Sequence, residues 1–323
     1  MKLSLEQIRG AEKLLRKYFA PTRLVEARSL ERAGGGRVYL KLESEQPTGS
    51  FKVRGAVYAL SMRMERGGVR EVVAPSTGNH GAAVAYAVKL LGIPATIFLP
   101  RNPNPVKRRK IAELGAKIVE EGKDSSVTFE AARDFSRREG VYLLNDATDE
   151  DLPAGPATIA SEIFEQAPAT DAIFVPMGDT ALIRGMASAA GHLRPKTPII
   201  GVQAEQAPSY YLSWEKRELV TTETCDTIAD GLATRIPEDS NVREILELVD
   251  EVRLVSEREM LAAIRHLMKS EKVMAEPAGA AATAALLQGA PEGARNIACI
   301  VSGANISEEV LKQARREAAG QSD

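Results

Sequence analysis

The sequence is poor in cysteine and histidine and has no long apolar run. Among 323 residues there are two cysteines and three histidines. Cys225 and Cys299 lie far apart without a CxxC pair, which excludes a disulfide framework and a cysteine-built zinc site, and three histidines exclude a histidine-rich metal site. No stretch reaches the roughly 18 apolar residues of a membrane span, and the charged N-terminus has no signal-peptide core. We therefore expect a cytoplasmic protein without a membrane partner.

An excess of charge of one sign is absent as well. The chain has 42 lysines and arginines against 44 aspartates and glutamates, a formal net charge of -2. Its densest basic cluster, residues 107 to 110, is interpreted as a solvated helix face because apolar residues follow it at helical spacing. Without a basic stripe that neutralises phosphates, nucleic acid is not expected as a partner.

Short runs rich in valine, isoleucine and phenylalanine alternate with longer segments of helical period. This βαβα order predicts parallel sheets covered on both faces. Candidate strands span residues 71–76, 95–100, 116–121, 141–146, 171–178, 198–205, 251–255 and 296–302. Candidate helices span residues 4–18, 80–91, 105–114, 158–165, 182–193, 261–269, 278–287 and 308–318. The chain is expected to cross between lobes at 147–156 and at the glycine run 34–36, which alternatively forms a hairpin turn.

Three junctions between a strand and a helix are candidate ligand sites, because ligands of open parallel sheets bind beyond the carboxyl ends of the strands. They are STGNH at 76–80, GDTA at 178–181 and SGAN at 302–305. Each places small residues before a helix, whose first N–H groups bind anions. None matches the GxGxxG or P-loop pattern, which disfavours nicotinamide and ATP as ligands.

Together with PTGSFKVRGA at 47–56, these junctions resemble the fold-type-II pyridoxal-phosphate enzymes, and the chain is similar to the threonine and serine dehydratases and serine racemases. TIADGLAT at 227–234 and EPAGA at 276–280 add to the resemblance, which runs from about Ala20 to Asn305. It implies a tryptophan synthase β-like α/β fold with two open parallel-sheet domains. Residues 1–46 and 146–323 would form a large cofactor-binding domain, and 47–145 a small inserted one.

The resemblance also implies a role for each matching residue. Lys52 would form the Schiff base with pyridoxal 5′-phosphate and act in catalysis, Phe51 would pack on the ring face, and Asn79 would hydrogen-bond the ring oxygen. The phosphate loop would consist of Gly178, Asp179, Thr180, Ala181 and Leu182. The substrate carboxylate would be bound by Ser76, Thr77, Gly78, Asn79 and His80; alternatively, His80 packs behind the others.

Ser302 occupies the position that would face the pyridine nitrogen. Because an alcohol donates a hydrogen bond but no full proton at neutral pH, the ring should stay unprotonated. A neutral pyridine is the weaker electron sink, which favours loss of a β-substituent over transamination.

The chain departs from the dehydratase pattern at several positions. Dehydratases of this family have four glycines and a leucine where this chain has GDTAL. Asp179 therefore puts a carboxylate near a phosphate, which is unfavourable unless it turns outward, is protonated or is paired. Arg184 is either its partner, or that of the phosphate, or an exposed helix arginine. Thr77 either supports racemisation as an acid/base or only binds carboxylate. Gln203 and Ser209 replace acidic ligands, so no divalent metal is expected.

The expected activity is that of a pyridoxal-phosphate lyase converting a small β-hydroxy-α-amino acid, such as L-threonine or L-serine, to a 2-oxo acid and ammonia. One alternative is an amino-acid racemase on the same cofactor. Another is a specialised dehydratase, because the altered phosphate loop resembles the dehydratases of hydroxyectoine utilisation. A third is a non-catalytic ligand-binding homologue. The resemblance alone implies a homodimer or higher homo-oligomer.

Overall fold

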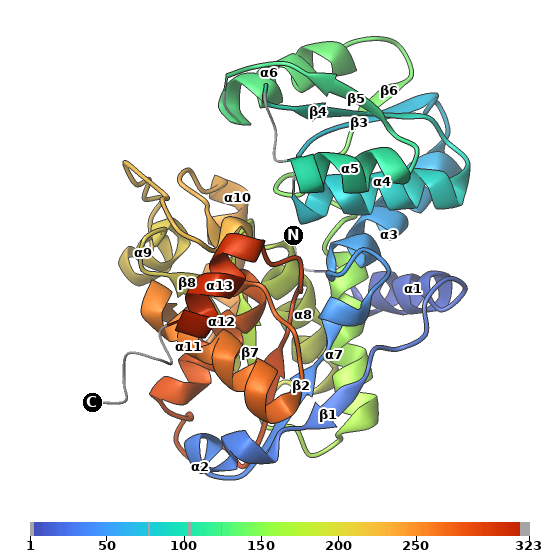
Figure 1. The fold of residues 1–323 in the computed structure, drawn as a ribbon. Coiled ribbons are helices and arrows are strands. Elements are labelled where there is room, and N and C mark those ends of the chain that lie inside the picture. Colours follow the sequence, from blue (N-terminus) through green and yellow to red (C-terminus); the bar gives the residue numbers. More distant parts are fainter. Residues whose placement is uncertain (1–2, 77, 102–104, 124, 317–323) are drawn as a thin grey trace.

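The structure is a computed structural model that describes residues 3–76, 78–101, 105–123 and 125–316. Within these residues the chain forms a six-stranded sheet in the order β1-β2-β10-β7-β8-β9 and a four-stranded sheet in the order β5-β4-β3-β6 (Figure 1). Helices separate most of the strands. The expected α/β fold with two mainly parallel sheets is confirmed.

The larger sheet carries most of the strands. It consists of β1 (Leu24–Glu26), β2 (Arg37–Lys41), β7 (Ala172–Pro176), β8 (Ile199–Ala204), β9 (Glu251–Val255) and β10 (Asn296–Ile300). Strands β7 and β8 are buried along their whole length, as expected of parallel strands covered on both faces. The edge strand β1 runs antiparallel to β2, whereas the other strand pairs described in this sheet are parallel.

The smaller sheet is parallel throughout. It consists of β3 (Glu71–Pro75), β4 (Ala95–Leu99), β5 (Lys117–Glu120) and β6 (Val141–Leu143). Its strands lie inside the segment 47–145, and those of the larger sheet lie outside it. The domain boundaries stay a prediction, because α3 (Lys52–Arg66) packs against both α4 (Asn79–Leu91) and α7 (Ala154–Gln166).

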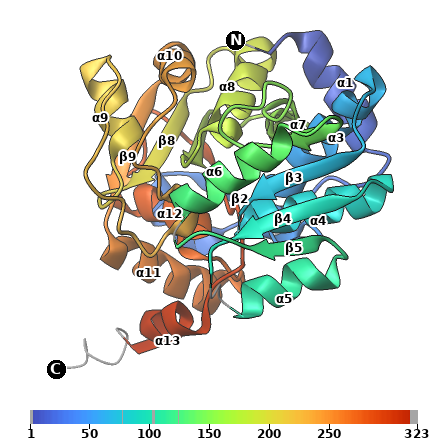
Figure 2. The ribbon, with the colours of Figure 1, turned by 90° about the horizontal axis from the view of Figure 1, so that it is seen from above.

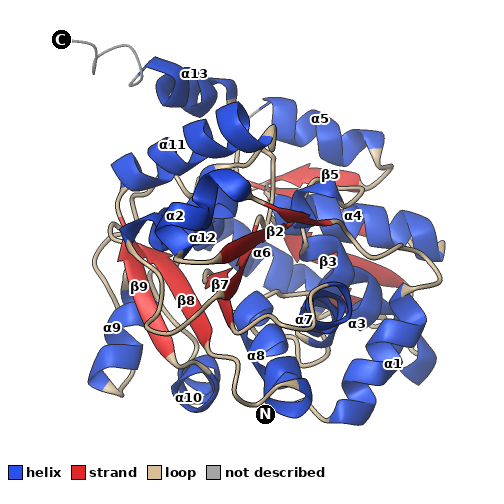
Figure 3. Cartoon of the chain, turned by 90° about the horizontal axis from the view of Figure 1, so that it is seen from below, coloured by secondary structure: helices blue, strands red, loops and turns tan. Residues whose placement is uncertain are grey.

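Helices cover both faces of each sheet. Figure 1 shows α6 on one face of the smaller sheet and α4 and α5 on the other, a layering that Figure 2 shows from above. Figure 3 shows α12 and α8 on opposite sides of the larger sheet. In the described part of the chain, none of the helices is long and apolar enough to cross a membrane. The remaining helices are α1 (Leu5–Leu15), α2 (Glu31–Gly34), α5 (Pro105–Glu113), α6 (Ser125–Ser136), α8 (Ala181–Leu193), α9 (Ser209–Lys216), α10 (Asp239–Leu248), α11 (Glu257–His266), α12 (Pro277–Gln288) and α13 (Glu308–Arg316).

The glycine run at 34–36 neither crosses between the sheets nor forms a hairpin turn. It ends α2 and leads into β2, and short helices separate β1 from β2. A Cβ atom on Gly36 would collide with the carbonyl oxygen of Arg295. The close approach of two backbone segments therefore requires glycine here.

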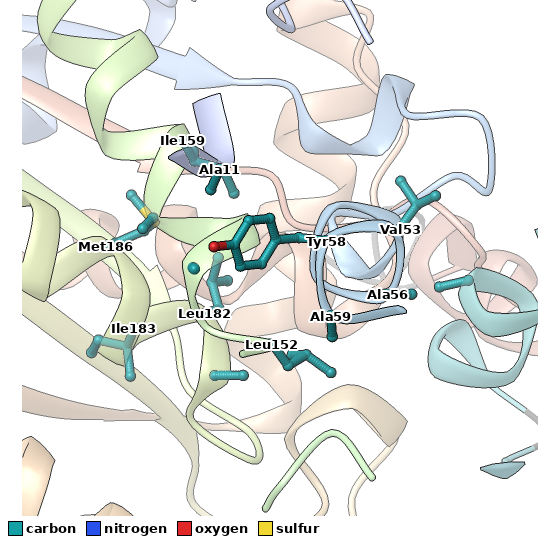
Figure 4. Close-up of a cluster of buried hydrophobic side chains, with 14 of the residues drawn as sticks. Ala11, Val53, Ala56, Tyr58, Ala59, Leu152, Ile159, Leu182, Ile183 and Met186 are labelled. Carbon is teal, nitrogen blue, oxygen red and sulfur yellow. The ribbon is translucent and has the colours of Figure 1, made fainter. Parts of the chain in front are cut away.

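One apolar cluster packs α3 against the helices around it. Figure 4 shows the ring of Tyr58, on α3, extending toward Leu182 of α8 and Ala11 of α1. Ile159 of α7 and Met186 of α8 are fully buried in the same cluster. The start of α3 and the start of α8 are thereby held in fixed positions by a common core.

A buried ionic cluster lies beside this core. Arg54 of α3 is 1% exposed. It donates to both carboxylate oxygens of Glu43, at 2.8 Å each, and to both of Glu162, at 2.6 and 2.9 Å. Lys41 of β2 donates to Glu162 at 2.6 Å. Buried charges need such pairing, so the cluster ties β2, α3 and α7 together.

Candidate functional site

A cavity of about 560 Å³ opens at the loops that follow β3, β6, β7 and β10. This volume is typical of small-molecule sites. Twelve of the sequence-predicted site residues line it; Thr77 lies outside the described residues. Their roles stay predictions. The twelve are Phe51, Lys52, Ser76, Gly78, Asn79, His80, Gly178, Asp179, Thr180, Ala181, Leu182 and Ser302.

Lys52 is the first residue of α3, and its amine reaches the cavity. Its Nζ lies 2.5 Å from Oδ2 of Asp146 and 5.5 Å from the ring centroid of Phe51. Burial lowers the pKa of Lys52, but the carboxylates of Asp146 and Asp179 outweigh this effect and hold the pKa above its ordinary value. Before any ligand reacts with it, the side chain is therefore an ammonium ion in a largely closed site.

The loop from Gly178 to Leu182 turns from β7 into α8. Thr180 adopts a left-handed conformation with φ of 67°, and a Cβ atom on Gly178 would collide with the carbonyl oxygen of Gly231. The first N–H groups of α8 have no carbonyl acceptor within their own helix and are available to a ligand. The positive end of the helix dipole adds to them. The loop therefore presents N–H groups to the cavity in an arrangement that anions bind, and its role as a phosphate loop stays a prediction.

Asp179 turns into the cavity rather than outward. Its Oδ1 accepts a hydrogen bond from Thr234 Oγ1 at 3.1 Å. Burial, and next the charge of Asp146, raise the pKa of its carboxyl group. The position of Asp179 in the cavity excludes the outward arrangement among the three that the sequence left open, and its hydrogen bond is with Thr234.

Arg184, on the first turns of α8, is not the exposed helix arginine of the sequence alternatives. It is 6% exposed. Its Nη1 donates to Glu244 at 3.2 Å and its Nε to Thr180 Oγ1 at 3.1 Å. Its ion pair is with Glu244 instead of Asp179, and its second contact holds the side chain of Thr180 in place.

Sequence reasoning missed a polar chain that crosses one wall of the cavity. Asn79 donates to Glu276 and accepts from Asn305, at 2.6 Å each. Lys110 donates to Asn305 Oδ1 at 2.6 Å and to Thr48 O at 2.8 Å. The interpretation of residues 107–110 as a solvated face was therefore wrong for Lys110. The sequence signals for this chain of residues were EPAGA, which begins with Glu276, and SGAN, which ends with Asn305.

His80 and Ser302 are both 5% exposed. Nε2 of His80 lies 2.9 Å from the carbonyl oxygen of Leu144. Among the described residues, Nδ1 of His80 has no hydrogen-bond partner, and it lies 3.8 Å from Oδ2 of Asp146. The hydroxyl of Ser302 donates to Ala278 O at the long distance of 3.4 Å, a weak bond that a better acceptor would replace.

Three comparisons place the chain among known proteins. A family model described as pyridoxal-phosphate dependent enzyme matches residues 15–303. The L-threonine ammonia-lyase of Thermotoga maritima is 36% identical over 309 residues, which are 96% of this chain and 77% of that protein. Maize serine racemase superimposes with a TM-score of 0.90 at 28% identity, over 99% of each chain. The processed form of threonine deaminase isoform 2 from Solanum lycopersicum has a TM-score of 0.89 at 28% identity, over 99% of this chain and 90% of that one.

Proposed function

This chain belongs to the family of pyridoxal-phosphate dependent enzymes, and we propose that it is an ammonia-lyase acting on a small β-hydroxy-α-amino acid such as L-threonine or L-serine. The products are a 2-oxo acid and ammonia. The observation that carries the proposal is that the amine of Lys52 and the N-terminus of α8 open into one cavity. The similarity to L-threonine ammonia-lyase over 96% of the chain supports the substrate class.

The residues of the cavity fit the cofactor. Lys52 supplies the amine for its aldehyde, the start of α8 supplies N–H groups for its phosphate, and Ser302 supplies a hydroxyl for its ring nitrogen. Bound pyridoxal phosphate provides a carbonyl carbon for amines and an electron sink for the α-carbon. Asp179 fits as well when its carboxyl group carries a proton.

The other residues bind the substrate and move its α-proton. The first N–H groups of α4, together with Ser76, bind the substrate carboxylate at the positive end of the helix dipole. Lys52 would act as the base within the cavity: in its neutral form, its amine would take the α-proton of the bound substrate. Loss of the β-hydroxyl group as water and hydrolysis then release the 2-oxo acid and ammonia.

A panel of β-hydroxy-α-amino acids tests this function. We expect the purified protein with pyridoxal phosphate to release ammonia and 2-oxobutanoate from L-threonine, or ammonia and pyruvate from L-serine, in equal amounts. Alanine, which lacks a β-leaving group, is the control and should yield no ammonia. Accumulation of D-serine without pyruvate would establish the racemase alternative instead, which the likeness to maize serine racemase favours.

Replacing Asp179 by asparagine should tighten cofactor binding about tenfold at pH 8, because it removes a charge beside the phosphate dianion. Asparagine can still accept the hydrogen bond from Thr234.

The raised pKa of Asp179 means that the wild-type carboxyl group is neutral below that pKa and repels phosphate above it. Wild-type affinity should therefore fall as pH rises, and the variant should lose this dependence. Fluorescence titration with pyridoxal phosphate measures both. Equal affinities at every pH would contradict the prediction, and the exposed Asp226→Asn is the control.

We also propose that the enzyme works in the cytoplasm as a homodimer or higher homo-oligomer. Cys225 and Cys299 are free cysteines, which supports a reducing compartment. The small amino-acid substrate proposed above needs no further partner.

A further inference from the structure

We propose that Asp146 is the counter-ion of Lys52 in catalysis and stabilises the ammonium ion that forms when the lysine takes the α-proton. This role rests on the proposed function for its substrate, whereas the contact between the two side chains does not. The resemblance to dehydratases and racemases assigned Asp146 no role. Because its carboxylate touches the reacting nitrogen, Asp146 would be a catalytic residue.

The position of Asp146 is set by the loop that follows β6. The N–H group of Ala147 donates to the side chain of Asn145 at 3.0 Å, and the N–H group of Asp149 donates to the carbonyl oxygen of Asn145 at 3.0 Å. These two bonds close the turn around Asp146. Its carboxylate consequently faces the cavity and contacts Lys52 Nζ at 2.5 Å, although 94 positions separate the two residues.

Both side chains of the pair are shielded from water. The side chain of Lys52 is 13% exposed and that of Asp146 is 18% exposed. Charges attract each other more strongly in such a site than at the surface. Burial opposes ionisation of Asp146, but the neighbouring His80 and Lys52 hold the pKa of its carboxyl group well below the ordinary value. Asp146 is therefore ionised at neutral pH and available as a counter-ion.

Three other titratable groups face this pair. His80 lies on α4, and its Nδ1 is 3.8 Å from the carboxylate of Asp146. Asp179 and Glu276 lie on other walls of the cavity, and both raise the pKa of Lys52. Among the described residues only Asp146 is shown in a hydrogen bond with Lys52 Nζ. The carboxylates of Asp179 and Glu276 are oriented by Thr234 and Asn79 instead. Asp146 is thus the acid positioned to determine how tightly Lys52 holds a proton.

The proton transfer shows why a counter-ion is needed. When Lys52 removes the α-proton, a C–H bond breaks, an N–H bond forms on Nζ, and the electron pair stays with the substrate. The neutral amine becomes a cation inside the cavity, where an isolated charge is costly. Asp146 offsets that cost and makes the amine a stronger base for the transfer. The proton leaves Lys52 again when the β-hydroxyl group departs as water and takes it up.

The Asp146→Asn variant tests this role, because asparagine keeps the size of the side chain and removes its charge. Cofactor is removed from the full-length protein and added back, and the rate of return of the absorbance band is measured against pH. Only neutral Lys52 reacts with the aldehyde. We expect the midpoint of this profile to move at least about one pH unit lower than in the wild type, so that cofactor returns about tenfold faster near neutral pH. An unchanged midpoint would overturn the proposal.

Two further variants complete the test. Asp146→Glu retains a carboxylate and should restore most of the wild-type profile. Asp151→Asn is the matched control. It removes the charge of another acid on the same loop, which forms an ion pair with Arg66, and it should leave the profile unchanged. Should the asparagine variant fail to fold, Asp146→Ser removes the charge with a smaller side chain and is judged by the same midpoint.

A second readout connects the pair to catalysis. In heavy water, exchange of the α-hydrogen of L-threonine by the holoenzyme should be at least about tenfold slower in Asp146→Asn than in the wild type. Equal exchange rates would show that Asp146 does not stabilise the ammonium ion during the reaction. The two proposals fail separately. If Asp146→Asn shifts the midpoint but the wild-type protein releases no ammonia, the counter-ion role of Asp146 is supported and the lyase function is refuted.

Discussion

The Lys52→Ala protein should release ammonia from L-threonine about 10³-fold more slowly than the wild type, or slower still, and should lack the absorbance band of a cofactor bound to lysine. Alanine removes the amine that we propose holds the cofactor aldehyde and takes the α-proton, and an acid–base group alone contributes about 10²- to 10⁴-fold. The loss follows from the position of Lys52, the cavity lysine at the start of α3. Absorbance spectra and an ammonia assay of the purified proteins measure the two effects.

Lys89→Ala is the matched control for this prediction. Lys89 lies exposed on α4, so its loss should leave the spectrum and the rate unchanged. Wild-type ammonia release by the Lys52→Ala protein would refute both the site and the function proposed for it. An unchanged absorbance band with lower activity would refute only the assignment of the Schiff-base lysine.

Arg54→Met should lower the free energy of unfolding by about 3 to 5 kcal/mol, which is the cost of breaking a buried ion pair from one side. The variant leaves the carboxylates of Glu43 and Glu162 buried, with Lys41 as their remaining cation in the cluster. Methionine fills part of the volume but donates no hydrogen bond. Urea denaturation at one fixed concentration of pyridoxal phosphate measures the change, since bound cofactor adds to stability.

Arg16→Met makes the same substitution in a surface ion pair. Arg16 donates to Glu165 at 2.8 Å, and both side chains are about half exposed, at 52% and 51%. Such pairs contribute about 0 to 1 kcal/mol, so this variant should unfold almost as the wild type does. If Arg54→Met cost no more than Arg16→Met, the buried cluster would not be a structural requirement of the fold.

The sequence predicted the strands of both sheets better than the helices around Lys52. The expected strand 251–255 coincides with β9, because the alternation of polar and apolar residues in EVRLV is a clear strand signal. Helix α3 was not predicted, since every residue from Val53 to Ser61 is buried. A helix covered on all sides has no polar face and therefore no visible period. Strand β2 was not predicted, because a lysine such as Lys41 is rarely buried in a strand. Its burial depends on the ion pair with Glu162, which lies 121 positions away in the sequence.

The candidate site shows the same limit. Residues within short motifs, such as Lys52, Asn79 and Ser302, could be placed by resemblance, and the structure brings them into one cavity. Asp146 and Lys110 could not, because their contacts join segments 94 and 195 positions apart. Asp146 was nevertheless open to inference, since it is the last residue of the predicted strand 141–146 and so lies at the carboxyl end of a strand in a parallel sheet.

The buried ionic cluster also determines when, during synthesis of the chain, the site can form. Lys41, Glu43 and Arg54 leave the ribosome early, but Glu162 follows only after the whole smaller sheet has been made. Until it arrives, the cations of the cluster have one carboxylate fewer than they need and remain hydrated. Helix α3, and with it Lys52, therefore has no stable docking position in the nascent chain before α7 emerges. Lys52 is therefore synthesised before the smaller sheet, yet its position is fixed only after that sheet is complete and Glu162 has followed.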